Sequence, residues 1–162
     1  MNAVNFLRGA TPSLLFCLAL SSSASGQAKT KSPVEFHNSP ALAPSPGYSQ
    51  SAVVTSGKLI FLSGQVGADK SGHIAKDDFN AQAKQAFENL KTILAENGAA
   101  PANLVKVNYY VVGLNTDRLK SLRAIRDQYI DVQHPPVSTL AGVKDLFREE
   151  CLIEIEAVAV VP

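Results

Sequence analysis

Hydrophobic and polar positions alternate most regularly in the last eleven residues, Leu152 to Pro162. Alternate residues of a strand point to opposite faces. One face of this predicted strand is wholly apolar and comprises Ile153, Ile155, Ala157, Ala159 and Val161. The other face carries Glu154 and Glu156. Two acids in so apolar a strand are costly unless each meets water, a partner or a substrate. The second face is therefore either wet or part of a pocket.

A longer apolar period predicts the first helix, which runs to about Asn97. Its apolar residues recur three and four positions apart, opposite a face of lysines and glutamates. They are Phe79, Ala83, Ala86, Phe87, Leu90, Ile93 and Leu94. Asp77 or Asp78 can cap its start, and Gly98 fits the position after its end.

A second helix is predicted over about residues 118–130, with Asn115, Thr116 or Asp117 as its cap. Its buried stripe comprises Leu119, Leu122, Ile125 and Tyr129. Five short apolar runs predict strands. They are Ser51–Val54, Leu59–Val66, Leu104–Val112, Val137–Val143 and Leu152–Val161.

This order of elements predicts an α+β domain, with two helices on one face of a mixed sheet. No helix remains to cover the other face of the sheet. An uncovered face of this kind favours self-association.

The first 28 residues have the pattern of a secretory signal peptide, with a short apolar run at Leu14–Leu20 and a small, polar segment after it. Cleavage is expected after Gly26 or Ala28. The apolar run is too short to span a bilayer as a helix, so no membrane attachment is expected after cleavage. The sequence thus predicts an exported protein, periplasmic or secreted, or a cytoplasmic one if the leader is not functional.

Residues 29–42 are rich in proline and serine and predict a flexible arm, and residues 43–162 form the predicted domain. The cysteines are Cys17 and Cys151, so loss of the leader leaves one thiol and no intramolecular disulfide. A small buried hydrophobe is the expected role of Cys151. The net charge of +1 and the lack of a basic run give no support to nucleic-acid binding.

Several segments, in this order and spacing, resemble one family. They are Pro46–Gln50 (PGYSQ), Leu59–Gln65 (LIFLSGQ), Phe87–Leu94 (FENLKTIL), Pro136–Leu140 and Ile153–Val160 (IEIEAVAV). From about residue 43 to its end, the chain resembles the Rid family of reactive intermediate deaminases, also called YjgF. The resemblance implies a chorismate-mutase-like fold, a homotrimer and clefts between neighbouring subunits. It also implies hydrolysis of small enamines and imines with release of ammonia, without a metal or organic cofactor.

By the same resemblance, Glu154 matches the acid that positions the attacking water. A carboxylate on a buried strand can accept a proton from water and direct it at a C=N carbon. An inter-subunit hydrogen bond is the alternative role for Glu154. The expected ligand-binding positions are Tyr48, the turn at Ser63, Gly64 and Gln65, and the fourth-strand residues Ser138 and Thr139. Each has a structural alternative, such as a core aromatic, a bulge or a strand-edge hydrogen bond.

Val137 departs from the family pattern. Deaminating members have an arginine in a PARS-type motif that grips the substrate carboxylate, and the corresponding segment here is Pro135–Ser138 (PPVS). Arg123 on the second helix could replace that arginine, or it could belong to a solvated face with Lys120 and Arg126.

Two functions therefore stay open. One is a Rid-like hydrolase for a C=N bond, and the other is a non-catalytic trimer that binds a small molecule. Val137 favours the binding protein, while Glu154 and the SGQ turn favour the enzyme. RNA cleavage has little support from charge or motif.

Overall fold

The computed structural model describes residue 1 and residues 32–161. The predicted signal peptide and the first part of the predicted arm fall outside these residues. Within the described part of the chain, no helix has the length and apolar content needed to cross a membrane.

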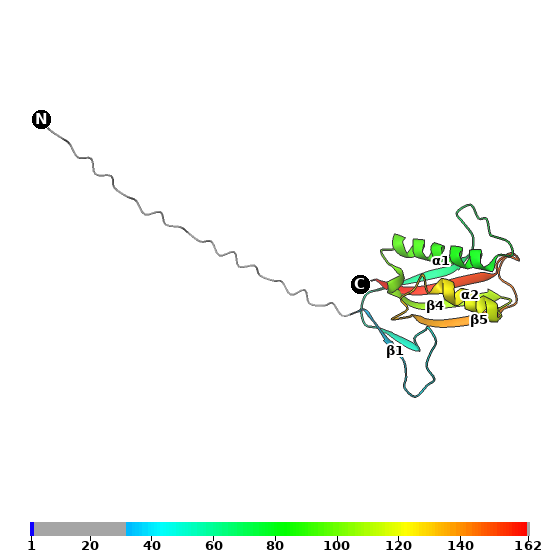
Figure 1. The fold of residues 1–162 in the computed structure, drawn as a ribbon, viewed down its shortest axis with the longest axis horizontal. Helices are drawn as coiled ribbons and strands as arrows, with labels where there is room; N and C mark the ends of the chain where they lie inside the picture. Colours follow the sequence, from blue (N-terminus) through cyan, green and yellow to red (C-terminus); the bar gives the residue numbers. More distant parts are fainter. Residues whose placement is uncertain (2–31, 162) are drawn as a thin grey trace. The chain divides into compact units, whose positions relative to one another are not determined.

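Helices and strands follow the predicted order, with one additional strand near the start (Figure 1). The strands are β1 (Val34–His37), β2 (Ser51–Val54), β3 (Lys58–Val66), β4 (Leu104–Val112), β5 (Val137–Val143) and β6 (Ile153–Val161). The helices are α1 (Phe79–Glu96), a short 3₁₀ turn (Pro101–Asn103) and α2 (Thr116–Arg126).

The main sheet has four strands in the order β3-β6-β4-β5. β6 pairs antiparallel with both of its neighbours, whereas β4 and β5 are parallel and are joined through α2. The mixed sheet and the α+β class are therefore as predicted. Because β6 lies between β3 and β4, its alternation decides which side chains occupy each face of the sheet.

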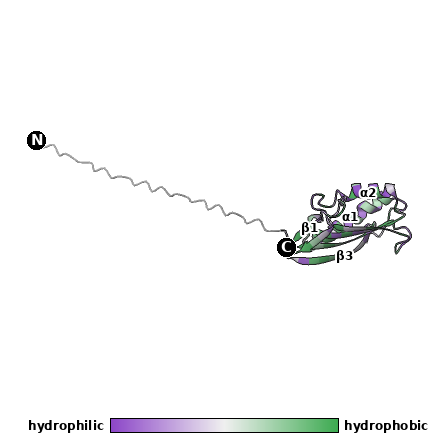
Figure 2. Cartoon of the chain, turned by 90° about the horizontal axis from the view of Figure 1, so that it is seen from below, coloured by the Kyte–Doolittle hydropathy of each residue, from purple (hydrophilic) through white to green (hydrophobic). Residues whose placement is uncertain are grey.

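Both helices pack on the same face of this sheet (Figures 1 and 2). α1 is capped by Asp78, whose side chain accepts a hydrogen bond from the Ala81 amide, and Gly98 follows its end with a φ of 70°. α2 is capped by Asn115 and ends at Arg126, four residues before the predicted end. Beyond it the chain continues in hydrogen-bonded turns.

The core between helices and sheet is centred on Phe87 of α1, which is 1% exposed. Its ring stacks on Tyr129 at 4.9 Å between centroids and lies tilted against Tyr109 of β4 at 6.1 Å. The buried face of β6 contributes the predicted apolar residues, among them Ile153 and Ile155. Cys151 is a free, buried thiol, as expected.

A second, two-stranded sheet joins β1 to β2 in antiparallel register, so Ser51–Val54 does not belong to the main sheet. The sequence pattern does not predict β1, because Val34–His37 is short and lies among prolines. Pairing with β2 supplies the backbone hydrogen bonds that so short a segment lacks on its own. Where the domain begins stays a prediction.

We call the face of the main sheet away from the helices the open face (Figure 2). On β3 it exposes Phe61 and Leu59, which are 76% and 52% accessible to solvent. Opposite them in the register lie Val158 and Val160 of β6. Apolar side chains on an uncovered sheet face mark a surface for association.

Candidate functional site

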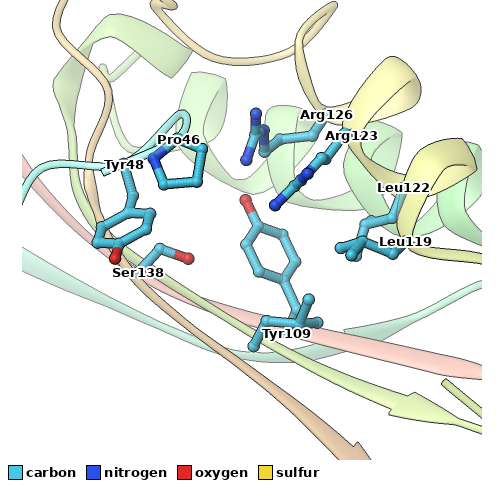
Figure 3. Close-up of a pocket in the computed structure, with 9 residues that line it drawn as sticks. Pro46, Tyr48, Tyr109, Leu119, Leu122, Arg123, Arg126 and Ser138 are labelled. Carbon is cyan, nitrogen blue, oxygen red and sulfur yellow. The ribbon is translucent and has the colours of Figure 1, made fainter. Parts of the chain in front are cut away.

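A cavity of about 230 Å³ lies between α2, the sheet and the loop before β2 (Figure 3). We call it the α2 cavity. Its lining residues come from segments far apart in the chain. They are Pro46, Tyr48, Tyr109, Leu119, Leu122, Arg123, Arg126, Ser138 and Leu140. It therefore combines an apolar wall with hydroxyl and guanidinium groups, which is typical of a small-molecule site.

The loop that carries Tyr48 is fixed by its neighbour Ser49, which is 2% exposed. The Ser49 hydroxyl donates a hydrogen bond of 2.6 Å to the Pro135 carbonyl, and its amide donates one of 3.2 Å to the Pro136 carbonyl. The loop thus docks beside the start of β5, which brings Tyr48 next to Ser138.

Arg126 forms the part of the wall next to that loop. Its side chain is only 12% exposed, and Nε and Nη2 donate hydrogen bonds of 2.9 and 2.7 Å to one carboxylate oxygen of Asp127. The guanidinium packs against Gly47, where a Cβ would lie 2.5 Å from Nη2. Gly47 has a φ of 81°, so glycine satisfies both the backbone conformation and the close approach.

Tyr109 forms the floor of the α2 cavity, with its hydroxyl directed toward Arg123 and Arg126 (Figure 3). The residue is 3% exposed. Burial raises the pKa of the Tyr109 hydroxyl well above its ordinary value, although the charge of Arg126 partly opposes this shift. The hydroxyl is therefore a neutral hydrogen-bond donor at physiological pH.

The two acids of β6 lie on the open face in different surroundings. Glu156 accepts a hydrogen bond of 2.7 Å from Asn108 Nδ2 and one of 3.0 Å from the Tyr110 hydroxyl, both through Oε1. This contact with the Glu156 carboxylate is the main reason that the pKa of Tyr110 is raised. Glu156 is thus held by its neighbours on β4.

Glu154 has no such hydrogen bond within the described residues, and it lies over Gly64 of β3. A Cβ at Gly64 would come within 1.8 Å of Glu154 Oε1. The register between β3 and β6 shifts between Leu62 and Gln65, so a bulge brings the glycine under the carboxylate. The predicted SGQ turn therefore gives the Glu154 side chain its room.

Sequence reasoning named nine site residues, and the structure divides them between the two faces of the sheet. The α2 cavity takes Tyr48, Arg123 and Ser138. Glu154 lies on the open face. Val137 and Thr139 lie on this face too, in register with Lys106 and Asn108, and so does Ser63, which is two residues after Phe61 on β3. Gly64 and Gln65 form the bulge, where Nε2 of the Gln65 side chain donates hydrogen bonds to the Ser63 and Gly64 carbonyls.

Sequence reasoning missed the polar lining residues Tyr109 and Arg126. The interpretation of residues 120, 123 and 126 as one solvated face holds for the exposed Lys120 but is wrong for Arg126. Residues 123 and 126 are three positions apart and share one face of α2. That spacing, together with a tyrosine on the buried face of β4, is the signal that could have identified the cavity.

The fold and these two sites define a class of small α+β protein with an acid on an uncovered sheet face and a polar cavity under its second helix. Within residues 32–161, no cluster of three acidic, histidine or cysteine side chains could hold a metal ion. The sequence profile of the family named Endoribonuclease L-PSP matches residues 38–161. The chain belongs to this family, whose members include the RutC and Rid proteins.

Individual relatives agree with this membership. A RutC family protein of Pyrococcus abyssi is 33% identical, over 72% of this chain and 90% of its own length. A 2-iminobutanoate/2-iminopropanoate deaminase of Dermatophagoides farinae is 29% identical, over 74% of this chain and 91% of its own. Among solved structures, YyfB from Yersinia pestis, a Rid-family protein of unknown function, has 30% sequence identity to this chain and superposes with a TM-score of 0.72. The superposition covers 80% of this chain and 99% of YyfB.

The raised pKa of Tyr109 predicts a loss of stability in alkali that Tyr109→Phe reduces. Below about pH 10, the ordinary pKa of tyrosine, both folded and unfolded chains keep this proton. Above it the unfolded chain loses the proton while the folded protein keeps it, so the free energy of unfolding falls by up to about 1.4 kcal/mol per pH unit. Urea unfolding from about pH 8 to about pH 11 should therefore show a steeper fall in the wild type. Equal slopes in both proteins would contradict the burial argument.

Proposed function

We propose that the chain is a Rid-like deaminase that hydrolyses the C=N bond of a small enamine or imine in clefts between protomers of a homotrimer. The observation that carries this proposal is the difference between the two acids of β6. Glu156 is engaged by Asn108 and Tyr110, whereas the Glu154 carboxylate packs over Gly64 and has no side-chain hydrogen bond within the described residues.

Glu154 is the proposed catalytic residue. Its carboxylate accepts a proton from water while the water oxygen bonds to the C=N carbon. The proton passes to the nitrogen, which gives a carbinolamine. Glu154 then transfers the proton of the carbinolamine hydroxyl to the nitrogen, and the C–N bond breaks to release ammonia and leave a carbonyl group. The name of the Dermatophagoides farinae relative supports this reaction class for the chain.

The separation of the site residues favours clefts between protomers. In the register between β4 and β6, Glu154 lies opposite Tyr110. The residue before Tyr110, Tyr109, points into the α2 cavity on the other side of the sheet. Glu154 and the cavity are therefore on opposite faces of one sheet, and a substrate in the cavity cannot reach Glu154 of the same protomer. A site with both needs the open face of one copy against the cavity edge of another.

The open face supports self-association because it combines exposed Phe61 and Leu59 with a buried polar atom that lacks a partner within the described residues. The buried Oδ1 atom of Asn108 has no hydrogen-bond partner within the described residues. A buried acceptor of this kind usually finds a partner, and a second copy can supply one.

The alternative is a trimer that binds a small molecule without turnover. Val137 favours it, because the resemblance places the carboxylate-gripping arginine at this position. Val137 pairs with Lys106 on the open-face side of β5, and a valine there offers no charge to a substrate. The same trimer and cavity would serve either function, so turnover decides between them.

Glu154→Gln should lower the rate of imine hydrolysis by at least about a hundredfold, because an amide cannot take the proton from water. The substrates are 2-aminoacrylate and the imines that an amino-acid oxidase produces. The measured quantity is 2-keto acid formation above the uncatalysed rate.

Glu156→Gln is the matched control, since it changes the neighbouring acid of the same strand and should leave most of the activity. Activity in the wild type that survives Glu154→Gln removes Glu154 from the mechanism. A wild type without activity on any of these substrates favours the binding protein instead.

Phe61→Asp should dissociate the trimer, because it places a charge in the centre of the proposed interface. Light scattering of the wild type should give three times the protomer mass, and the variant should give smaller species. Val132→Asp changes an apolar residue that is 51% exposed in the loop after α2, and it should remain trimeric. A wild-type protein that stays monomeric at working concentrations would refute the assembly.

A further inference from the structure

The hydroxyl of Tyr109 is the unexplained polar group of the α2 cavity. It has no hydrogen-bond partner within the described residues, although its residue is 3% exposed and its ring is fixed against Phe87. Tyrosine hydroxyl groups in buried positions usually have a partner. Because this hydroxyl points into the α2 cavity, it can donate a hydrogen bond to water or to an acceptor of a ligand there (Figure 3).

The charge of the cavity comes from Arg123. Arg126 is compensated, because Asp127 accepts both of its hydrogen bonds and Gly47 packs against it. Arg123 is exposed at the mouth, and its side chain has no ion pair or hydrogen bond within the described residues. The cavity thus offers one free guanidinium, which suits a single negative charge.

The remainder of the cavity wall suits an apolar group of limited size. Leu119 and Leu122 of α2 and Leu140 of β5 contribute aliphatic side chains, and the cavity volume is about 230 Å³. Ser138 adds one hydroxyl beside the ring of Tyr48. A ligand with one acid group and a short branched or aromatic body matches this composition.

We propose that the α2 cavity binds a small apolar monocarboxylate, whose acid group lies between the Arg123 guanidinium and the Tyr109 hydroxyl. This inference rests on the proposed function in taking the cavity as the substrate side of the cleft. It assigns carboxylate recognition to α2 and β4, rather than to the start of β5. Arg126 serves as a positioning residue that holds the Tyr48 loop in place.

The proposal explains how the chain can do without an arginine at residue 137. Val137 is in register with Lys106 on the open-face side of β5, whereas Ser138, the next residue, lines the cavity. A carboxylate that enters the cavity is therefore met from the helix side, by Arg123.

Isothermal titration calorimetry with 3-methylbutanoate tests the proposal, with 3-methylbutanamide as its neutral counterpart. The full-length wild type should bind the carboxylate at least about tenfold more tightly than the amide. Arg123→Gln should weaken carboxylate binding by about tenfold to a hundredfold and leave amide binding unchanged. Tyr109→Phe, which removes only the donor, should weaken it by about threefold to tenfold.

Lys120→Gln is the matched control, because it removes an exposed charge from the same helix away from the cavity, and its affinity should stay within about twofold of the wild type. Arg123 lies at the surface, so its variant should keep the fold, and thermal unfolding checks both site variants. Equal affinity for acid and amide, or full affinity in Arg123→Gln, would overturn the proposal.

Titration of the Glu154→Gln variant with 3-methylbutanoate distinguishes the carboxylate site from the proposed deaminase activity. Unchanged carboxylate affinity in that variant, together with loss of turnover, supports both. Wild-type binding without any turnover keeps the carboxylate site and ends the deaminase. Turnover with a KM that does not change in Arg123→Gln keeps the deaminase and ends the carboxylate site.

Discussion

The alternation of β6 is the constraint on which the rest of the structure depends. Its odd-numbered residues from Ile153 to Ala159 fill the core under the two helices, so Glu154 and Glu156 must point to the opposite face. A shift by one residue would bury both acids under Phe87 and expose the isoleucines, which makes the register strongly specified. The position of the catalytic candidate is thus fixed by the same contacts that stabilise the domain.

This constraint also explains why one protomer holds only part of a site. The open face has an acid without a side-chain hydrogen bond in the described residues, and the helix side has a cavity with the Arg123 guanidinium and the Tyr109 hydroxyl. A four-stranded sheet separates them. The proposed trimer resolves both problems, since an interface over Phe61 would cover the apolar open face and bring the two halves together.

The sequence was sufficient to predict the main helices and strands, because the hydrophobic period and the turn and capping residues indicated the same boundaries. The alternation of β6, the stripe of α1 and the caps at Asp78 and Asn115 are local features, and each was found where expected. The α2 cavity was not predictable in the same way. Arg126 has the composition of a solvated helix face, and only the packing of the loop at Gly47 against it makes it a wall. The Tyr109 hydroxyl likewise becomes part of a site only because α2 and the Tyr48 loop enclose a cavity over it, and no sequence pattern records this packing.

Complementation between two impaired variants tests the central claim most directly. Glu154→Gln and Arg123→Gln each damage a different half of the proposed cleft, and co-expression mixes them within trimers. If each cleft takes Glu154 from one protomer and Arg123 from its neighbour, roughly a quarter of the clefts in a random mixture are intact. We predict that, at substrate concentrations below KM, mixed trimers recover about that share of wild-type activity. Activity no greater than the mean of the two separate variants would show that the two residues do not meet in a shared cleft.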